Sequence, residues 1–142
     1  VIGQHCVNRE KIEQYCHDNE NVTLHIQTTK MAQLLFEADI AIGAGGVSLW
    51  ERCYLGVPSI TLVVAENQKE IAEKAAADGL TLLAGTAQQD NLECLEGLLL
   101  QLLEDGALRL QMKEKMQALY PENGKHGVIE IVRTMEEMNH VG

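Results

Sequence analysis

A short glycine-rich segment, Gly43–Ser48, is the part of this sequence best suited to binding chemistry. It lies between an apolar stretch typical of a strand and a helical pattern that begins at Val47. Glycines let a backbone approach an anion closely, and free N–H groups at a helix start favour phosphate. The segment therefore predicts phosphate contacts from Gly45, Gly46, Val47 and the Ser48 hydroxyl. A tight turn that binds nothing is an equally weighted alternative, and the spacing fits neither a P-loop nor G-x-G-x-x-G.

Glu51 lies in the first turn or so of the helix that should follow. A carboxylate so close to a bound phosphate would repel it, so a contact one unit further along the ligand suits it better. Its two oxygens match the two hydroxyls of a ribose, which are neighbouring donors. The alternative is a carboxylate that only complements the helix dipole, worth about 0.3–1 kcal/mol.

A second polar turn, Ala65–Gln68, follows the most apolar stretch of the chain, Ser59–Ala65. Amide side chains at the end of a buried strand can recognise hydroxyl and N-acetyl groups, which makes Asn67 and Gln68 candidate sugar contacts. The alternative, stronger on local grounds, is that Asn67 caps the next helix.

Strand-like and helix-like segments alternate along the chain. The expected strands are residues 22–26, 39–43, 59–65 and 80–84, and the expected helices are residues 31–38, 47–55, 68–78, two leucine- and methionine-rich segments after Asp90, and 128–135. Asp90 and Glu93 have the spacing of a capping box. Short loops between alternating strands and helices predict an α/β fold, a Rossmann-like doubly wound parallel sheet with helices on both faces.

Composition narrows the range of partners. The formal net charge of -10 argues against nucleic acid and anionic membranes, and no apolar run reaches the ~20 residues of a membrane span. The four cysteines form no C-x-x-C pair and the five histidines are scattered, so we expect no metal site and a cytoplasmic protein with reduced thiols. Without a linker, residues 1–142 should form one domain. Because Val1–Gly3 reads as the tail of a strand, we expect an N-terminally truncated piece of a longer enzyme.

Four motifs together resemble a known enzyme family. The resemblance is dense from Thr23 to Gly79. The motifs are Met31-Ala-x-Leu-Leu-x-x-Ala-Asp39, Gly43-Ala-Gly-Gly-Val-Ser-x-Trp-Glu-Arg52, Leu55-Gly-Val-Pro58 and Ala65-Glu-Asn-Gln68. They are similar to those of the UDP-2,4-diacetamido-2,4,6-trideoxy-β-L-altropyranose hydrolases of pseudaminic acid biosynthesis, which act in flagellin glycosylation. That family is similar in turn to the MurG-type glycosyltransferases, two-domain enzymes of GT-B fold.

The resemblance implies the C-terminal, UDP-binding half of a GT-B enzyme. By matching position, Gly45, Gly46 and Ser48 would hold the diphosphate and Glu51 the ribose. Gln27 and Thr28 would lie against uracil, and Asn67 and Gln68 would face the sugar. The implied reaction is attack of water on the anomeric carbon, with no metal and no cofactor.

The family's catalytic histidine would lie in an N-terminal domain that these residues do not contain. We therefore expect no catalytic residue in this chain, and that domain as its partner in the active site. A MurG-type glycosyltransferase with a UDP-sugar donor and a non-catalytic nucleotide-sugar-binding domain remain alternatives.

Overall fold

The computed structural model describes residues 1–87 and 91–120, and its centre is a parallel sheet in the order β1-β2-β3. The strands are β1 (Ala41–Ala44), β2 (Ser59–Val63) and β3 (Leu82–Thr86). Ile60 of β2 is in register with Ile42 on one side and Leu82 on the other. The central strand is the most buried, as expected for a continuous apolar run inside a parallel sheet.

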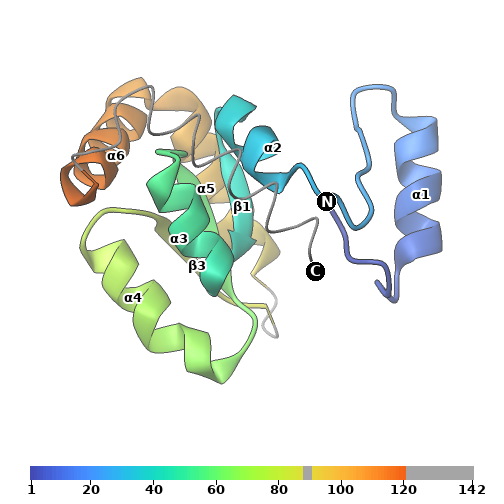
Figure 1. Ribbon diagram of the computed structural model, residues 1–142, viewed down its shortest axis with the longest axis horizontal. Helices are drawn as coiled ribbons and strands as arrows, with labels where there is room; N and C mark the ends of the chain where they lie inside the picture. Colours follow the sequence, from blue (N-terminus) through green and yellow to red (C-terminus); the bar gives the residue numbers. More distant parts are fainter. Residues whose placement is uncertain (88–90, 121–142) are drawn as a thin grey trace.

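Helices cover both faces of this sheet (Figure 1). The helices are α1 (Arg9–Asp18), α2 (Met31–Glu37), α3 (Val47–Tyr54), α4 (Lys69–Ala77), α5 (Leu92–Glu104) and α6 (Gly106–Leu119), with a 3-10 turn, η1 (Glu66–Gln68), before α4. The helices α3 and α4 pack on one face and α5 on the other. The doubly wound α/β arrangement predicted from the sequence is confirmed.

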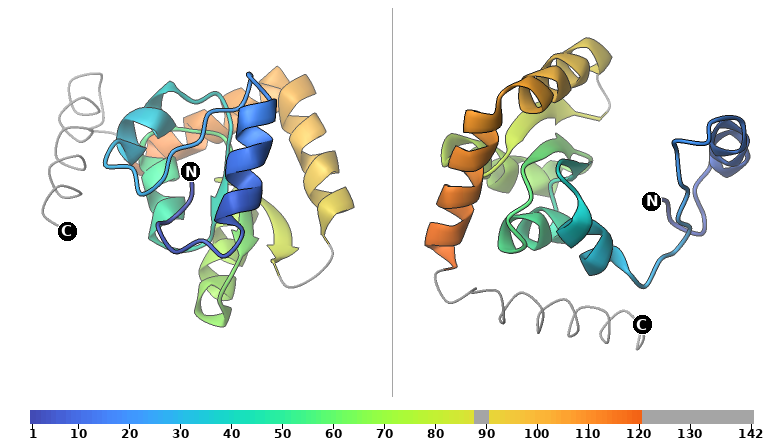
Figure 2. Two further views of the ribbon diagram at one scale, coloured as in Figure 1. Left: turned by 90° about the vertical axis from the view of Figure 1, so that its right-hand side faces the viewer. Right: turned by 90° about the horizontal axis from the view of Figure 1, so that it is seen from above.

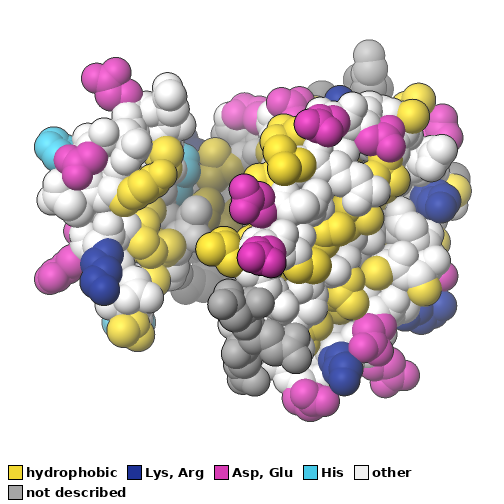
Figure 3. All heavy atoms as spheres, turned by 180° about the vertical axis from the view of Figure 1, so that it is seen from behind, with side chains coloured by type: hydrophobic (Ala, Val, Ile, Leu, Met, Phe, Trp, Pro, Cys, Tyr) yellow, Lys and Arg dark blue, Asp and Glu magenta, His cyan; other side chains and the backbone are white. Residues whose placement is uncertain are grey.

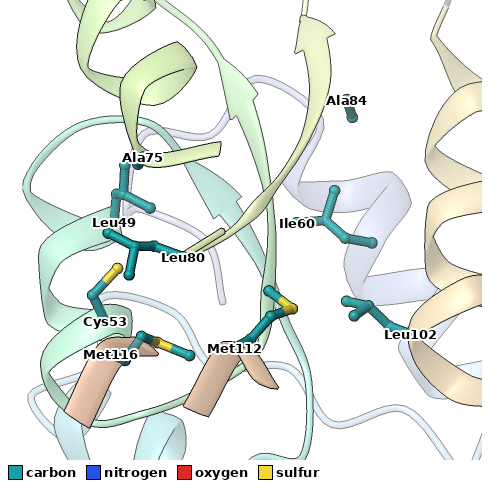
Figure 4. Close-up of a cluster of buried hydrophobic side chains, with 9 residues drawn as sticks. All are labelled: Leu49, Cys53, Ile60, Ala75, Leu80, Ala84, Leu102, Met112 and Met116. Carbon is teal, nitrogen blue, oxygen red and sulfur yellow. The ribbon is translucent and has the colours of Figure 1, made fainter. Parts of the chain in front are cut away.

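The core forms on both sides of the sheet (Figure 4). Ile60 and Ala84 point toward Leu102 of α5, while Leu49 and Ala75 come from the helices on the opposite face. All five side chains are buried. Since successive residues of a strand point to opposite faces, Thr61 faces α3 and α4, which places a polar residue directly under the glycine segment.

The glycines that follow two of the predicted helices do end them in the structure. Gly56 and Gly79 directly follow the helices predicted at 47–55 and 68–78, and they have φ of +70° and +74°, the left-handed conformation that glycine adopts most easily. Leu92, at the start of the first leucine-rich segment after Asp90, is 69% exposed and lies outside the core. The Asp90 capping box and the helix expected at 128–135 lie outside the described residues.

The N-terminal segment differs most from the sequence prediction. The strand expected at 22–26 is wrong: within the described residues, its only pairing is an isolated parallel bridge between Ile2 and Ile26. The sequence analysis also missed α1, which buries none of its residues and lies apart from the sheet (Figure 2). From behind, hydrophobic side chains line the flank of this helix that faces the body of the molecule, and acidic side chains are spread over the visible surface (Figure 3).

Candidate functional site

The glycine-rich segment forms the turn from β1 into α3. Gly46 is the N-cap residue of α3, and its carbonyl accepts a hydrogen bond from the Leu49 N–H at 3.0 Å. The backbone N–H groups of the four residues from Gly45 to Ser48 have no acceptor among the described residues. Four consecutive free donors at a helix start make this turn a candidate anion site, because hydrogen bonding and the helix dipole both favour negative charge there. We call Gly45–Ser48 the glycine turn.

Close packing explains why this turn contains glycine. A Cβ atom on Gly45 would lie 3.3 Å from the Ala72 Cβ and 3.4 Å from the Thr61 Cγ2. A Cβ on Gly46 would lie 3.0 Å from the Gln68 Nε2. The turn therefore rests directly on β2 and the start of α4, and larger residues would push it outward.

Arg52 lies beneath the glycine turn and is 2% exposed. Its Nη1 donates to the Ser48 Oγ at 3.2 Å, and its Nη2 donates to the Ala44 carbonyl at 3.1 Å and to the Thr61 Oγ1 at 2.9 Å. A Cβ on Gly43 would lie 2.5 Å from Nη1, so the absence of that side chain makes room for the guanidinium. Burial lowers the pKa of Arg52, and the neighbouring Cys53 and Glu51 oppose that shift.

Sequence analysis did not single out Arg52, because an arginine on a helix is ordinarily exposed. The available signal was its position four residues after Ser48, which places both on one face of α3. Ser48 itself uses its hydroxyl to donate to the Ala44 carbonyl at 3.3 Å. That bond is long for a hydroxyl donor, so a phosphate oxygen can compete for the proton.

Glu51 lies in the second turn of α3, whose first turn contains no acidic residue. This is one residue beyond the first turn and agrees with the expected place in the first turn or so, while the helix-dipole effect is weaker there because it fades beyond the first turn. Glu51 is half-buried, and burial raises the pKa of its carboxyl, while Arg52 opposes the shift.

The second polar turn has a different geometry. Gln68 folds back on the strand: its Oε1 accepts a hydrogen bond from the Val64 N–H at 3.1 Å. The N-cap residues of η1 and α4 are Ala65 and Gln68, so the expected cap by Asn67 is wrong. Asn67 is exposed and has no hydrogen bond within the described residues.

The turn expected to lie against uracil has an unusual backbone. Gln27 has a φ of +50°, which non-glycine residues rarely adopt and which clusters at ligand-binding segments. Its N–H donates to the Ile2 carbonyl at 2.9 Å and its Oε1 accepts from the Gln4 N–H at 3.2 Å. The Thr28 Oγ1 accepts a hydrogen bond from the Lys30 N–H at 3.1 Å. These contacts fix the turn, and its relation to the glycine turn stays a prediction.

Two further findings concern metals and membranes. Within residues 1–87 and 91–120, no three side chains of His, Cys, Asp or Glu gather in a way that could hold a metal ion. No helix in the same part of the chain is long and apolar enough to cross a membrane.

A parallel sheet with helices on both faces and a glycine-rich turn at the carboxyl end of β1 matches the fold of the C-terminal half of a GT-B glycosyltransferase. Residues 1–132 match the model of the glycosyltransferase family 28 C-terminal domain, and the chain belongs to that family.

The chain is also similar to two known proteins, of which the solved structure concerns the fold alone. The spore coat polysaccharide biosynthesis protein SpsG of Bacillus subtilis (strain 168) is 28% identical over 138 residues, which cover 97% of this chain and 40% of SpsG. The crystal structure of the glycotransferase of kitacinnamycin superposes with a TM-score of 0.56 at 17% identity, over 96% of this chain and 42% of that protein. The chain thus spans about two fifths of the length of each relative.

Proposed function

We propose that the glycine turn binds the diphosphate of a UDP-linked sugar. The observation that carries this proposal is the run of four unpaired N–H groups at the start of α3, above a buried guanidinium. A diphosphate needs several fixed donors and positive potential, and the turn supplies both without rearranging.

The other predicted residues extend the site along the ligand. Glu51, one helical turn from the glycine turn, accepts hydrogen bonds from the ribose hydroxyls. Asn67, exposed and without a hydrogen bond within the described residues, is available to the sugar. Gln27 and Thr28 lie against uracil through main-chain groups. Gln68 acts indirectly in this proposal, since its side chain already holds Val64 and lies against Gly46.

For the whole protein we propose hydrolysis: release of UDP from UDP-2,4-diacetamido-2,4,6-trideoxy-β-L-altropyranose by water, in polysaccharide biosynthesis in the cytoplasm. The support is the Trp50-Glu51-Arg52 motif together with Ala65–Gln68, which resemble that hydrolase family. The catalytic base would come from the N-terminal domain of the same protein.

Transfer of the sugar to an acceptor is the second candidate, and membership in a glycosyltransferase family favours it. Incubation of the full-length protein with the UDP-sugar separates the two. UDP release with no acceptor present supports hydrolysis, while release that requires an acceptor supports transfer. Binding of UDP with no turnover under either condition would favour a non-catalytic domain.

The binding proposal has its own test, calorimetric titration of the full-length protein with UDP and with uridine. UDP should bind more tightly than uridine, because only UDP has the diphosphate. Equal affinities would contradict a diphosphate site at the glycine turn.

A further inference from the structure

The side chain of Arg52 is an unusual feature of the site, because its buried positive charge forms no ion pair among the described residues, and the neighbouring Glu51 carboxylate acts on it only from beyond ion-pair distance. Both ion pairs formed by the described residues, Arg9–Glu13 and Lys74–Asp78, lie on the surface elsewhere. The acceptors of Arg52 are two hydroxyls and one carbonyl, all neutral. Its Nε is buried and has no hydrogen-bond partner among the described residues.

Such an arrangement is costly for a protein that binds nothing. Removing a guanidinium from water is expensive, and neutral hydrogen bonds recover only part of that cost. Buried charges are ordinarily paired, so a missing counter-charge points to a ligand that brings it.

The position of the guanidinium indicates that the ligand is an anion bound at the glycine turn. Its two terminal nitrogens contact Gly43, Ala44 and Ser48, which precede and close the turn whose N–H groups are unpaired. On its other side it is anchored by Thr61, which shares a hydrogen bond of 2.8 Å with Thr81 in the buried interior. An anion on the glycine turn would therefore lie directly over a fixed positive charge.

We propose that Arg52 is a positioning residue of the diphosphate site, whose charge is balanced by the bound diphosphate. It fixes the Ala44 carbonyl and the Ser48 hydroxyl from below, and it polarises that hydroxyl so that it donates more strongly to a phosphate oxygen. This inference rests on the proposed nucleotide-sugar function and deepens it by naming the source of positive charge in an acidic chain of net charge -10.

The experiment compares UDP with uridine in the full-length protein by calorimetry, for the wild type, Arg52→Gln, Arg52→Lys and Thr61→Val. The measured quantity is the ratio of UDP affinity to uridine affinity, which a general loss of folding would not change selectively. We expect Arg52→Gln to reduce this ratio about tenfold or more, the size of one charge-assisted interaction. Arg52→Lys keeps the charge and should retain the ratio within about threefold, since a change under 0.7 kcal/mol is expected.

Thr61→Val is the matched control. It removes one acceptor of Arg52 but leaves the charge, and Thr81 keeps its hydrogen bond to the Ser59 carbonyl. The ratio should fall by less than in Arg52→Gln, because one anchor of the guanidinium is lost but its charge stays. A ratio that Arg52→Gln leaves unchanged, or that Thr61→Val lowers equally, would overturn the proposal.

Thermal unfolding of each variant shows whether it folds. If Arg52→Gln does not fold, Arg52→Met is the second neutral variant, since apolar residues often replace a buried charge without loss. If neither neutral variant folds, Arg52→Lys decides: a retained ratio supports the proposal and a lost ratio overturns it.

Failure of the proposed function gives a different result. A wild-type protein that binds neither UDP nor uridine rejects nucleotide binding. Inorganic pyrophosphate is then the probe for Arg52: binding that Arg52→Gln weakens supports the positioning role, and a wild type that binds no pyrophosphate overturns it.

Discussion

Two strand-to-helix turns lie side by side at the same edge of the sheet, and they use their polar groups in opposite ways. In the glycine turn after β1, four backbone N–H groups have no acceptor among the described residues. In the turn after β2, the Val64 N–H is taken by the Gln68 side chain and the Gln68 N–H by the Ala65 carbonyl. One turn is open to an anion, and the other closes on itself.

The cause of the difference is the contact between them. Gln68 packs over Gly46, so the second turn acts as a support for the first. The same position in an α/β sheet can thus be a ligand site or the structure that holds it. Residue type at the turn decides: glycine offers no side-chain acceptor to the backbone donors, while the amide side chain of Gln68 supplies one to Val64.

The largest effect on stability and UDP affinity should come from Gly45→Val, which disrupts the packing of the glycine turn on its neighbours. Its side chain would collide with Ala72 and Thr61, so we expect the free energy of unfolding to fall by about 1–3 kcal/mol through overpacking. Displaced N–H groups should cost UDP binding a further 2–4 kcal/mol, roughly one or two charge-assisted hydrogen bonds. Denaturant unfolding and UDP titration measure the two quantities.

Gly97→Val is the control for this change, because a Cβ at Gly97 on α5 meets nothing within 4 Å. It should leave UDP affinity unchanged. If Gly45→Val binds UDP as well as Gly97→Val does, the glycine turn is not the diphosphate site.

Glu51→Gln should have the next largest effect. If the carboxylate holds the ribose hydroxyls, the change should cost roughly 1–3 kcal/mol of UDP affinity. Pyrophosphate affinity, measured by the same titration, should change much less, because pyrophosphate has no ribose. The matched control is Glu70→Gln in the first turn of α4, which should leave UDP affinity unchanged. UDP affinity that stays the same or improves in Glu51→Gln would show that the carboxylate only repels the phosphates.

The pH dependence of Glu51 has a defined sign. Burial raises the pKa of its carboxyl in the folded protein, so the stability from this group is present below its ordinary pKa and is lost as pH rises through the raised value. Glu51→Gln should therefore be as stable as the wild type at neutral pH, or slightly more stable. Uridine affinity of the wild type should fall as pH is lowered through the raised pKa, and that of Glu51→Gln should not. A parallel fall in both proteins would contradict the ribose role.

Gln68→Ala and Asn67→Ala should distinguish a residue that stabilises the turn from a residue that contacts the sugar. Gln68→Ala removes the hydrogen bond to Val64 and should cost about 0.5–1.5 kcal/mol of unfolding free energy. Asn67→Ala should change stability by less than about 0.5 kcal/mol and lower affinity for the UDP-sugar but not for UDP. Equal effects of Asn67→Ala on both ligands would remove Asn67 from the sugar site.

The sequence predicted the sheet and the open turn because both are local patterns. The apolar run Ser59–Ala65 predicts a buried strand, and the Gly43–Ser48 segment predicts a turn before a helix. Neither prediction depends on which residues pack against these segments in the folded protein. Arg52 was not predicted, because its burial depends on space left by Gly43 and on acceptors from another strand. The strand at 22–26 was wrong for a related reason: a strand needs a partner, and in the part of the chain that the structure describes Ile26 pairs with Ile2 alone. The burial of Arg52 and the absence of a strand at 22–26 both depend on tertiary contacts, which residue propensities do not describe.

The smallest expected effect is that of removing divalent metal from the UDP titration. We expect UDP affinity of the full-length protein to be the same with and without EDTA. The free N–H groups of the glycine turn and the charge of Arg52 supply the donors and positive potential that a metal ion would otherwise bring to a diphosphate. Arg52→Gln makes the test sharper. Added magnesium should increase the UDP affinity of this variant, which lacks the buried charge, and should not change the UDP affinity of the wild type. A large loss of wild-type affinity in EDTA would show that the glycine turn and Arg52 are insufficient, and that a cation completes the site.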